Sequence, residues 1–169
     1  MTAVVGLRTP RSIIVAADSA ICDEDSDTTW LTAGKIRRVG NIVAAGAGDA
    51  AVTSAFLASL TPKDEKLSPQ RLAERLLDLV EDRDRESSFS NVVVALGGDL
   101  WVLDTTGAFD RPSQNYVAVG SGAKAAMGAL FALAFEHNPC FEDARTAVSA
   151  AASCCEGVRL PAIVMEVRR

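Results

Sequence analysis

The sequence predicts an α+β fold in which two mainly antiparallel sheets form a sandwich, with a pair of helices on each outer face. Continuous apolar strands such as VVVAL (92–96) and IIVAA (13–17) are typical of sheets that are covered on both faces. The predicted order is strands, two helices, strands, two helices, strand, which argues against the strictly alternating units of a Rossmann arrangement. A chain of 169 residues fits a single domain spanning 1–169.

The first part of the chain predicts two strand pairs. AVVGL (3–7) and SIIVAAD (12–18) are apolar runs joined by the turn signal RTPR. KIRRVG (35–40) and NIVAAGAG (41–48) form a second pair around a Gly-Asn turn. Between the pairs, ICDEDSDTTWLTAG (21–34) is acidic and rich in hydroxyl groups, and we expect an irregular excursion there.

The next segment predicts the first pair of helices. Small residues recur at helical spacing after Asp49, and this pattern ends near Thr61-Pro62. The small residues are Ala51, Ser54, Ala55, Ala58 and Ser59. Ser68-Pro69 then combines a helix cap with proline at the first helical position, and RLAERLLDLVEDR carries leucines at helical spacing.

The remainder of the chain repeats this order. NVVVALGGDLWVLD (91–104) is a clear hairpin around two glycines, and YVAVGSG (116–122) is a short strand that runs into the apolar helix 123–137. A second alanine-rich helix covers 141–156, and the strand PAIVMEV (161–167) closes the chain.

Composition excludes several classes of function. A net charge of −5 leaves no basic patch for nucleic acid. No apolar run approaches the roughly 20 residues of a membrane span, and the N-terminus lacks a secretion signal, so we expect a cytoplasmic protein with reduced thiols. Its 4 cysteines show no CxxC spacing and its single histidine is His137, so we expect no metal and no cofactor.

Conventional nucleophile sites are poorly represented. Most of them need a histidine, and His137 ends an apolar helix beside a turn, where a surface or capping role fits better. HExxH and P-loop motifs are absent, and the glycines of GSGAKAAMG alone are weak support for phosphate binding. The remaining candidate is Thr2, because a small second residue permits removal of Met1. Threonine would then carry a hydroxyl beside a free α-amine, whose pKa is about 7.7–8.0 in short peptides.

Four short motifs, which carry five residues in the expected order, resemble the proteasome β-subunit and HslV family of N-terminal-nucleophile hydrolases. TAVVGLRTPRSIIVAAD resembles the family's opening hairpin, with its threonine as Thr2 and its aspartate as Asp18. KIRRVG resembles the lysine-bearing strand and supplies Lys35, one residue later than usual. AAGAGDAA resembles the turn that forms the oxyanion hole, at Gly48, and AVGSG resembles the turn whose serine binds the terminal amine, at Ser121. The resemblance covers nearly the whole chain and implies the αββα sandwich of this family.

The resemblance also implies a division of labour. Thr2 would attack a peptide carbonyl while its own amine takes the proton, and Lys35 would supply the positive charge that favours the ionised hydroxyl. Asp18 would hold Lys35 charged and in place. The Gly48 N–H would donate to the oxyanion, a contact worth roughly 3 kcal/mol in other hydrolases, and Ser121 would orient the amine.

Each of these residues also has a purely structural interpretation. Asp18 could end a strand, Lys35 could be an exposed charge on an edge strand, Gly48 could begin a helix and Ser121 could be its N-cap. Only their joint occurrence with a terminal Thr2 favours the catalytic interpretation.

Two features depart from the family. It usually carries an accessory aspartate in the last helix and a hydroxyl three residues on, whereas this chain has Ser153 or Cys154 at the first position and Gly157 at the second. The acidic stretch 23–27 has no clear counterpart. It is either a solvated loop or part of a chamber lining that tunes substrate choice.

The leading hypothesis is a threonine-type endopeptidase that forms a self-compartmentalising ring. The resemblance implies unfolded protein or peptide substrates, a homo-oligomeric double ring of hexamers or heptamers of the simple bacterial type, without a propeptide, and, by analogy, an ATPase unfoldase as partner. The alternative is a ring protein that keeps the fold in a structural or regulatory role with little or no activity. An amidase for small amides is a third hypothesis, which the short chain disfavours.

Overall fold

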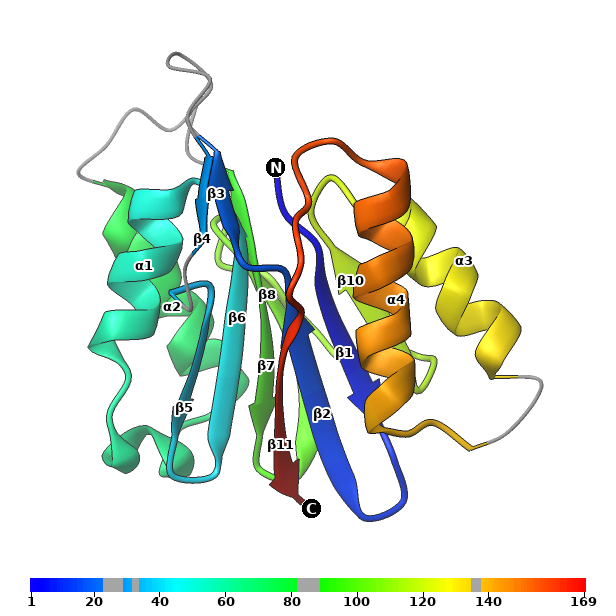
Figure 1. Cartoon of the computed structure of the whole chain (residues 1–169). Helices are drawn as coiled ribbons and strands as arrows, with labels where there is room; N and C mark the ends of the chain where they lie inside the picture. The colour runs from blue at the N-terminus through cyan, green and yellow to red at the C-terminus, as the bar shows by residue number, and fades with distance from the viewer. Residues whose placement is uncertain (23–28, 32–33, 82–88, 135–137) are drawn as a thin grey trace.

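The elements of this protein are arranged in four layers, with two sheets between two pairs of helices (Figure 1). The computed structural model describes residues 1–22, 29–31, 34–81, 89–134 and 138–169. The helices are α1 (Ala50–Ser59), α2 (Pro69–Glu81), α3 (Ala123–Leu133) and α4 (Phe141–Cys154). This αββα arrangement confirms the predicted fold class. His137 and the stretch 23–27 lie outside the described residues.

The first sheet contains the two strands of the opening hairpin at its centre. Its order is β10-β1-β2-β11, and neighbouring strands are antiparallel. The strands are β1 (Val4–Arg8), β2 (Ser12–Ala17), β10 (Tyr116–Val119) and β11 (Ile163–Arg168). Every residue of β1 and β2 is buried, as the continuous apolar runs predicted.

The second sheet is antiparallel and has the order β5-β6-β7-β8-β9. Its strands are β5 (Ile36–Val39), β6 (Ile42–Gly48), β7 (Ser90–Leu96), β8 (Asp99–Asp104) and β9 (Phe109–Asp110). The Gly40-Asn41 and Gly97-Gly98 turns join the hairpins at the predicted places, and Gly40, Gly97 and Gly98 have positive φ.

Three apolar clusters hold the layers together. The central cluster packs the two sheets face to face through residues such as Val15, Val43 and Leu100, all with 0% exposure. Phe56 and Leu76 belong to a second cluster between the second sheet and helices α1 and α2. A third, rich in alanine, packs α3 and α4 on the first sheet. Small side chains there allow close packing of the helices on the sheet.

Three details of the structure differ from the sequence prediction or add to it. The stretch expected to be irregular contains a short antiparallel pair, β3 (Ala20–Cys22) and β4 (Thr29–Leu31). The small residues of α1 were predicted only as a helical stripe, and the structure places that stripe outward, because Val52, Phe56 and Leu57 occupy the buried face. A short 3-10 helix, η1 (Pro62–Lys66), also precedes α2.

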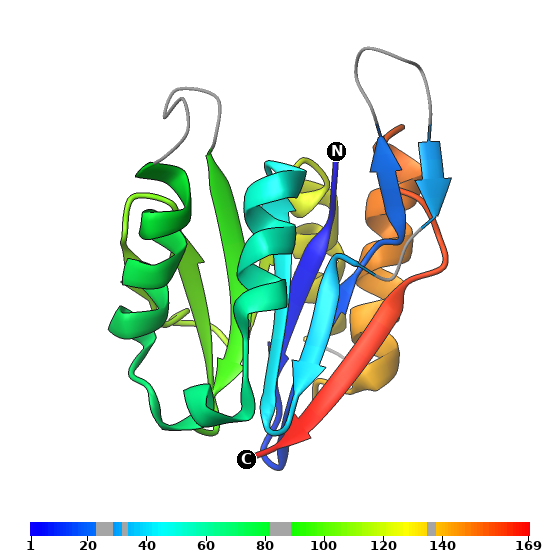
Figure 2. The same ribbon diagram turned by 90° about the vertical axis from the view of Figure 1, so that its left-hand side faces the viewer.

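The two chain ends lie at opposite ends of the sandwich (Figure 2). Met1 is at the end where β2 finishes and β6 leads into α1, whereas Arg169 lies beside the turn between β7 and β8, its guanidinium donating to Gly98 O at 2.9 Å. Over the described part of the chain, none of the helices is both long and apolar enough to cross a membrane.

Candidate active site

Thr2 lies at the mouth of the sandwich, immediately before β1, and only 7% of it is exposed. Its backbone N–H donates to the Ser121 hydroxyl at 3.0 Å, and its carbonyl oxygen accepts from the Gly122 N–H at 3.1 Å. Both partners belong to the turn between β10 and α3. This single turn therefore fixes the position of the Thr2 backbone.

The Thr2 hydroxyl lies next to Lys35, the lysine of the KIRRVG motif. Lys35 Nζ donates to Thr2 Oγ1 at 2.8 Å, and it also donates to both carboxylate oxygens of Asp18, at 3.0 and 3.1 Å. Only 10% of the Lys35 side chain is exposed, so the interpretation as an exposed edge-strand charge is wrong. A buried ammonium beside a hydroxyl stabilises the ionised form of that hydroxyl.

Asp18 is the anchor of this cluster and is fully buried. Backbone N–H groups of Ala3, Ala20 and Arg159 donate to its carboxylate at 3.0, 3.1 and 3.4 Å. These donors come from the residue before β1, from β3 and from the segment before β11. A buried carboxylate needs such partners, and together with Lys35 they fill its acceptor sites. Asp18 follows the end of β2, but it does more than end the strand.

Gly48 ends β6 beside Thr2, with φ +123°. A side chain there would collide with the Phe89 carbonyl and, at 2.7 Å, with Ser90 Oγ, so the close approach of β7 requires glycine. The N-cap of α1 is the following residue, Asp49, whose carboxylate accepts from two N–H groups of the first turn. Gly48 therefore belongs to the strand and lines the same pocket as Thr2.

Ser121 precedes α3 and faces Thr2. The N-cap of α3 is Gly122, which has no side-chain cap, so the interpretation of Ser121 as an N-cap is wrong. Gly120, with φ +93°, precedes it, and a side chain at this position would collide with the Thr2 carbonyl. In the GSG sequence, the first glycine allows the backbone to approach the Thr2 carbonyl closely, and the serine hydroxyl accepts from the Thr2 N–H.

The accessory positions at the end of α4 hold different chemistry. Ser153 donates to Ser149 O at 3.0 Å within its own helix, and Cys154 is exposed, so α4 turns both away from its buried face. The residue that reaches the site is Cys155, whose Sγ lies 3.6 Å from the Ser121 carbonyl oxygen. Gly157 packs against the Met1 side chain.

A pocket of about 600 Å³ opens beside Thr2. Gly48 and Ser121 line it, together with three side chains that the sequence did not single out, those of Asp49, Phe89 and Asn91. The pairing of Ala47 with Asn91 across β6 and β7 brings these residues to the site. Only the strand register could have revealed Phe89 and Asn91 in advance, because they lie far along the chain from the β6 residues that they accompany, whereas Asp49 directly follows Gly48.

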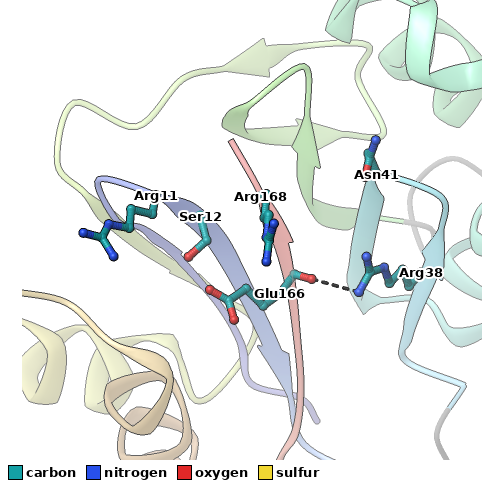
Figure 3. A pocket seen from close by; sticks show the side chains of 6 residues that line it. All are labelled: Arg11, Ser12, Arg38, Asn41, Glu166 and Arg168. Atoms are coloured by element: carbon teal, nitrogen blue, oxygen red, sulfur yellow. Dashed lines mark hydrogen bonds between the residues drawn. The ribbon is translucent and has the colours of Figure 1, made fainter.

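A second hollow, of about 680 Å³, lies at the other end of the sandwich (Figure 3). It is lined by Arg11, Ser12, Arg38, Asn41, Glu166 and Arg168. Arg38 donates to the backbone carbonyl of Glu166 at 3.1 Å. The Ser12 hydroxyl is buried and lies 2.9 Å from the Thr9 hydroxyl, with no cation or base against it in the described contacts. The pocket beside Thr2 is therefore the better candidate for chemistry. In the described ranges, no group of three or more His, Cys, Asp or Glu side chains could hold a metal ion.

Comparisons with known proteins identify the family and the fold of this chain. The family described as "Proteasome subunit" matches residues 2–159. The ATP-dependent protease subunit HslV of Roseobacter denitrificans is 26% identical over 162 residues, covering 91% of this chain and 86% of that protein.

Solved structures share the fold. Eukaryotic HslV from Trypanosoma brucei has a TM-score of 0.76 at 20% identity, with 99% of each chain covered. BPH from Thiobacillus denitrificans has a TM-score of 0.76 at 22% identity, covering 98% of this chain and 97% of that one. The same protein in complex with epoxomicin gives a TM-score of 0.75 at 20% identity, covering 98% of each chain. Because the family match spans nearly the whole chain, this protein belongs to the proteasome subunit family.

Proposed function

We propose that this protein is a threonine-type endopeptidase subunit whose nucleophile is Thr2 after removal of Met1. One observation carries the proposal: Asp18, fully buried, holds Lys35 Nζ at 2.8 Å from Thr2 Oγ1. The name of the HslV relative, a protease subunit, supports the same reaction class. While Met1 is attached, Thr2 N is a peptide nitrogen and cannot act as a base, so its removal is part of the proposal.

The proposed reaction proceeds through an acyl ester. Thr2 Oγ1 bonds to the peptide carbonyl carbon as its proton passes to the Thr2 amine, and the Gly48 N–H stabilises the oxyanion. The C–N bond then breaks, and the amine returns the proton to the leaving nitrogen. Water hydrolyses the ester with the same amine as base, which restores the hydroxyl.

Lys35 and Ser121 have separate tasks in this scheme. The Lys35 ammonium stays charged beside Asp18 and favours development of negative charge on Thr2 Oγ1. The Ser121 hydroxyl, 3.0 Å from Thr2 N, orients the amine so that its lone pair faces the hydroxyl proton. Burial of these groups makes both effects stronger than they would be in water.

We also propose that the chain forms a homo-oligomeric double ring that degrades unfolded proteins. The outward face of α1 carries small residues, and Phe131 on α3 is 55% exposed, so both helices offer apolar surface to another subunit. The words "ATP-dependent" in the relative's name support an ATPase unfoldase as partner. Cys154 and Cys155 form no disulfide, which fits the proposed cytoplasmic location.

Intact mass spectrometry tests the nucleophile. We expect wild-type protein to have lost Met1 and to gain the mass of one epoxomicin, an epoxyketone whose two electrophilic carbons suit a hydroxyl and an amine on one residue. Thr2→Ala should gain nothing, whereas Thr106→Ala, a change at an exposed threonine, should react normally. Processed protein that never reacts would contradict the proposal. Light scattering should give the mass of a multi-subunit assembly, and a monomer mass at micromolar concentration would contradict the proposed ring.

The alternative function is a ring subunit with little or no turnover. The observation that favours it is the end of α4, where Cys155 and Gly157 take the places next to Ser121 and Met1. A thiol and a glycine cannot supply the negative charge of an accessory carboxylate. An assembled ring with Met1 removed but no adduct would identify this role.

A further inference from the structure

The pocket beside Thr2 occupies one side of the residue. Lys35 Nζ donates to Thr2 Oγ1 and Asp18 accepts from the Ala3 N–H, and neither residue lines the pocket, whereas Ser121, which binds Thr2 N, does. The pocket is therefore on the amine side of the nucleophile. This asymmetry matters because the two halves of a substrate peptide lie on different sides of the scissile bond, so only one of them can occupy the pocket.

The proposed chemistry dictates which half lies over the pocket. The leaving nitrogen must take its proton from the Thr2 amine, so it has to come within hydrogen-bond distance of that amine. The residue that follows the scissile bond is attached to this nitrogen. That residue must then lie on the Ser121 side, in the pocket, and removal of Met1 makes further room for it. This step rests on the proposed function.

The strand register fixes the walls of the pocket. Asn91 pairs with Ala47 across β6 and β7, so their side chains share one face of the sheet. Phe89 precedes Asn91 by two residues and lies on that same face, while Ser90 between them points the other way and is fully buried. Ala47, Phe89 and Asn91 thus line the pocket from one face of the sheet.

The Phe89 backbone is held in place although its ring is 58% exposed. Its carbonyl packs on Gly48, and the next residue, Ser90, accepts from the Asp49 N–H at 3.0 Å and donates its own N–H to Thr105 at 3.2 Å. An exposed aromatic ring on a fixed backbone next to the oxyanion position can contact substrate at little entropic cost.

The polar groups of the pocket favour a cation. Asp49 Oδ1 accepts two N–H groups at the start of α1, which leaves Oδ2 for a ligand among the described contacts. Because Asp49 already occupies those N–H groups, they are not available to an anionic side chain. The lining residues include this carboxylate, the Asn91 side-chain amide and the Phe89 ring, and no lysine, arginine or histidine side chain is among the residues that line the pocket. All three groups attract a positive charge.

We propose that this pocket selects lysine or arginine as the residue immediately after the scissile bond. The aliphatic stem would lie along Ala47 and Phe89, and the charged head would reach the Asp49 carboxylate and the Asn91 oxygen. Phe89, Asn91 and Asp49 are then specificity residues for the leaving half of the substrate.

Cleavage of matched peptides tests this assignment. Quenched fluorescent peptides that differ only after the scissile bond, with Lys, Arg, Ala, Leu or Glu there, are compared by kcat/KM, and mass spectrometry verifies the cut. We expect Lys and Arg to exceed Ala by about tenfold and Glu by more. Asp49→Asn retains an N-cap and should lower the Lys-to-Glu ratio about fivefold or more. Phe89→Leu should lower the Lys-to-Ala ratio about threefold.

Ratios within one variant cancel any change in total activity. Asp78→Asn removes an equal charge from an exposed site on α2 and should leave every ratio unchanged. Equal rates for all five peptides, a preference for Leu, or unchanged ratios in both pocket variants would overturn the inference. Epoxomicin has its electrophile at its C-terminal end and tests only the acyl half. An adduct without selective cleavage therefore refutes the inference alone, whereas no adduct and no cleavage refutes the proposed function with it.

Discussion

Asp18 and Asp64 are both buried carboxylates, and each is paired with one cation. Asp64, at 5% exposure, binds Arg75 through two hydrogen bonds of 2.9 and 3.0 Å and accepts from the Thr61 N–H at 2.7 Å. All its partners lie within one short segment, from η1 to α2. Asp18 instead joins four segments that lie far apart along the chain, through Ala3 before β1, Ala20 in β3, Lys35 before β5 and Arg159 before β11.

The difference lies in what the cation does with its remaining donors. Both terminal nitrogens of Arg75 bond to Asp64, and the pair fastens α2 to the capping box of η1. Lys35 bonds to Asp18 and still donates to Thr2 Oγ1. Arg75 lowers the pKa of Asp64 to about 2, chiefly through these hydrogen bonds. We infer that one pair serves stability and the other positions a charge for chemistry.

The largest expected effect separates the pairs by reactivity. Lys35→Met removes the charge beside Thr2 Oγ1, so we expect the rate of epoxomicin adduct formation to fall about 10²–10³-fold. Time-resolved intact mass spectrometry measures this rate. Lys63→Met, at an exposed lysine, is the matched control and should react at the wild-type rate. A Lys35→Met rate within threefold of wild type would remove the distinction.

The second effect concerns stability alone. Asp64→Asn leaves Arg75 without its charged partner, and since about a third of the Arg75 side chain is exposed we expect a loss of about 2 kcal/mol in the free energy of unfolding. Urea denaturation at one fixed protein concentration measures it. The adduct rate should stay unchanged, and Asp110→Asn, at an exposed site, should alter neither quantity. A slower adduct would show that the Asp64 pair also supports the site.

Acid should weaken the Asp64 pair in a defined window. Its folded pKa of about 2 lies below the ordinary 3.8, so the stability it contributes is complete above pH 4–5 and is lost as the pH falls toward 2. After allowance for screening, the expected loss is about 1–2 kcal/mol. Urea midpoints of wild type and Asp64→Asn should therefore converge between pH 5 and 2.5. A constant difference across this range would contradict the pKa assignment.

The smallest expected effect concerns Ser121, the neighbour of Thr2 in the candidate active site. Ser121→Ala removes the hydroxyl that binds Thr2 N, whereas the Gly122 N–H still holds the Thr2 carbonyl. We expect adduct formation to slow about tenfold, with a loss of stability below about 1 kcal/mol. Rates and urea midpoints measured on the same samples test this. An unchanged rate with a large loss of stability would make Ser121 a structural residue.

The order of elements could be predicted because each depends on local chemistry. Alternating or continuous apolar runs, paired glycines and the Ser68-Pro69 cap act over a few residues. The β3 and β4 pair was missed because its few apolar residues stand among acidic ones. The small-residue stripe of α1 faces outward because the larger apolar side chains of Val52 and Phe56 bury more apolar surface in the core.

The site shows the same division. Thr2, Asp18, Lys35, Gly48 and Ser121 came from motifs in the sequence. Their catalytic roles remain proposals. Phe89 and Asn91 had no local signal, because they reach the pocket only through pairing of β7 with β6. Cys155 likewise reaches Ser121 only because α4 and α3 pack side by side.

By itself, the sequence determined the αββα layering, which follows from short-range patterns of polarity and turn chemistry. It also supplied the candidates for the site, through short motifs that resemble those of the proteasome family. Tertiary structure alone decided that Lys35 is buried against Asp18 and aimed at Thr2, and that Phe89, Asn91 and Asp49 form a wall on the amine side. Such distances depend on strand register and on the packing of two sheets, which bring together groups that lie far apart along the chain. A register shift of one residue in β6 would turn Ala47 away from the pocket and disrupt this lining.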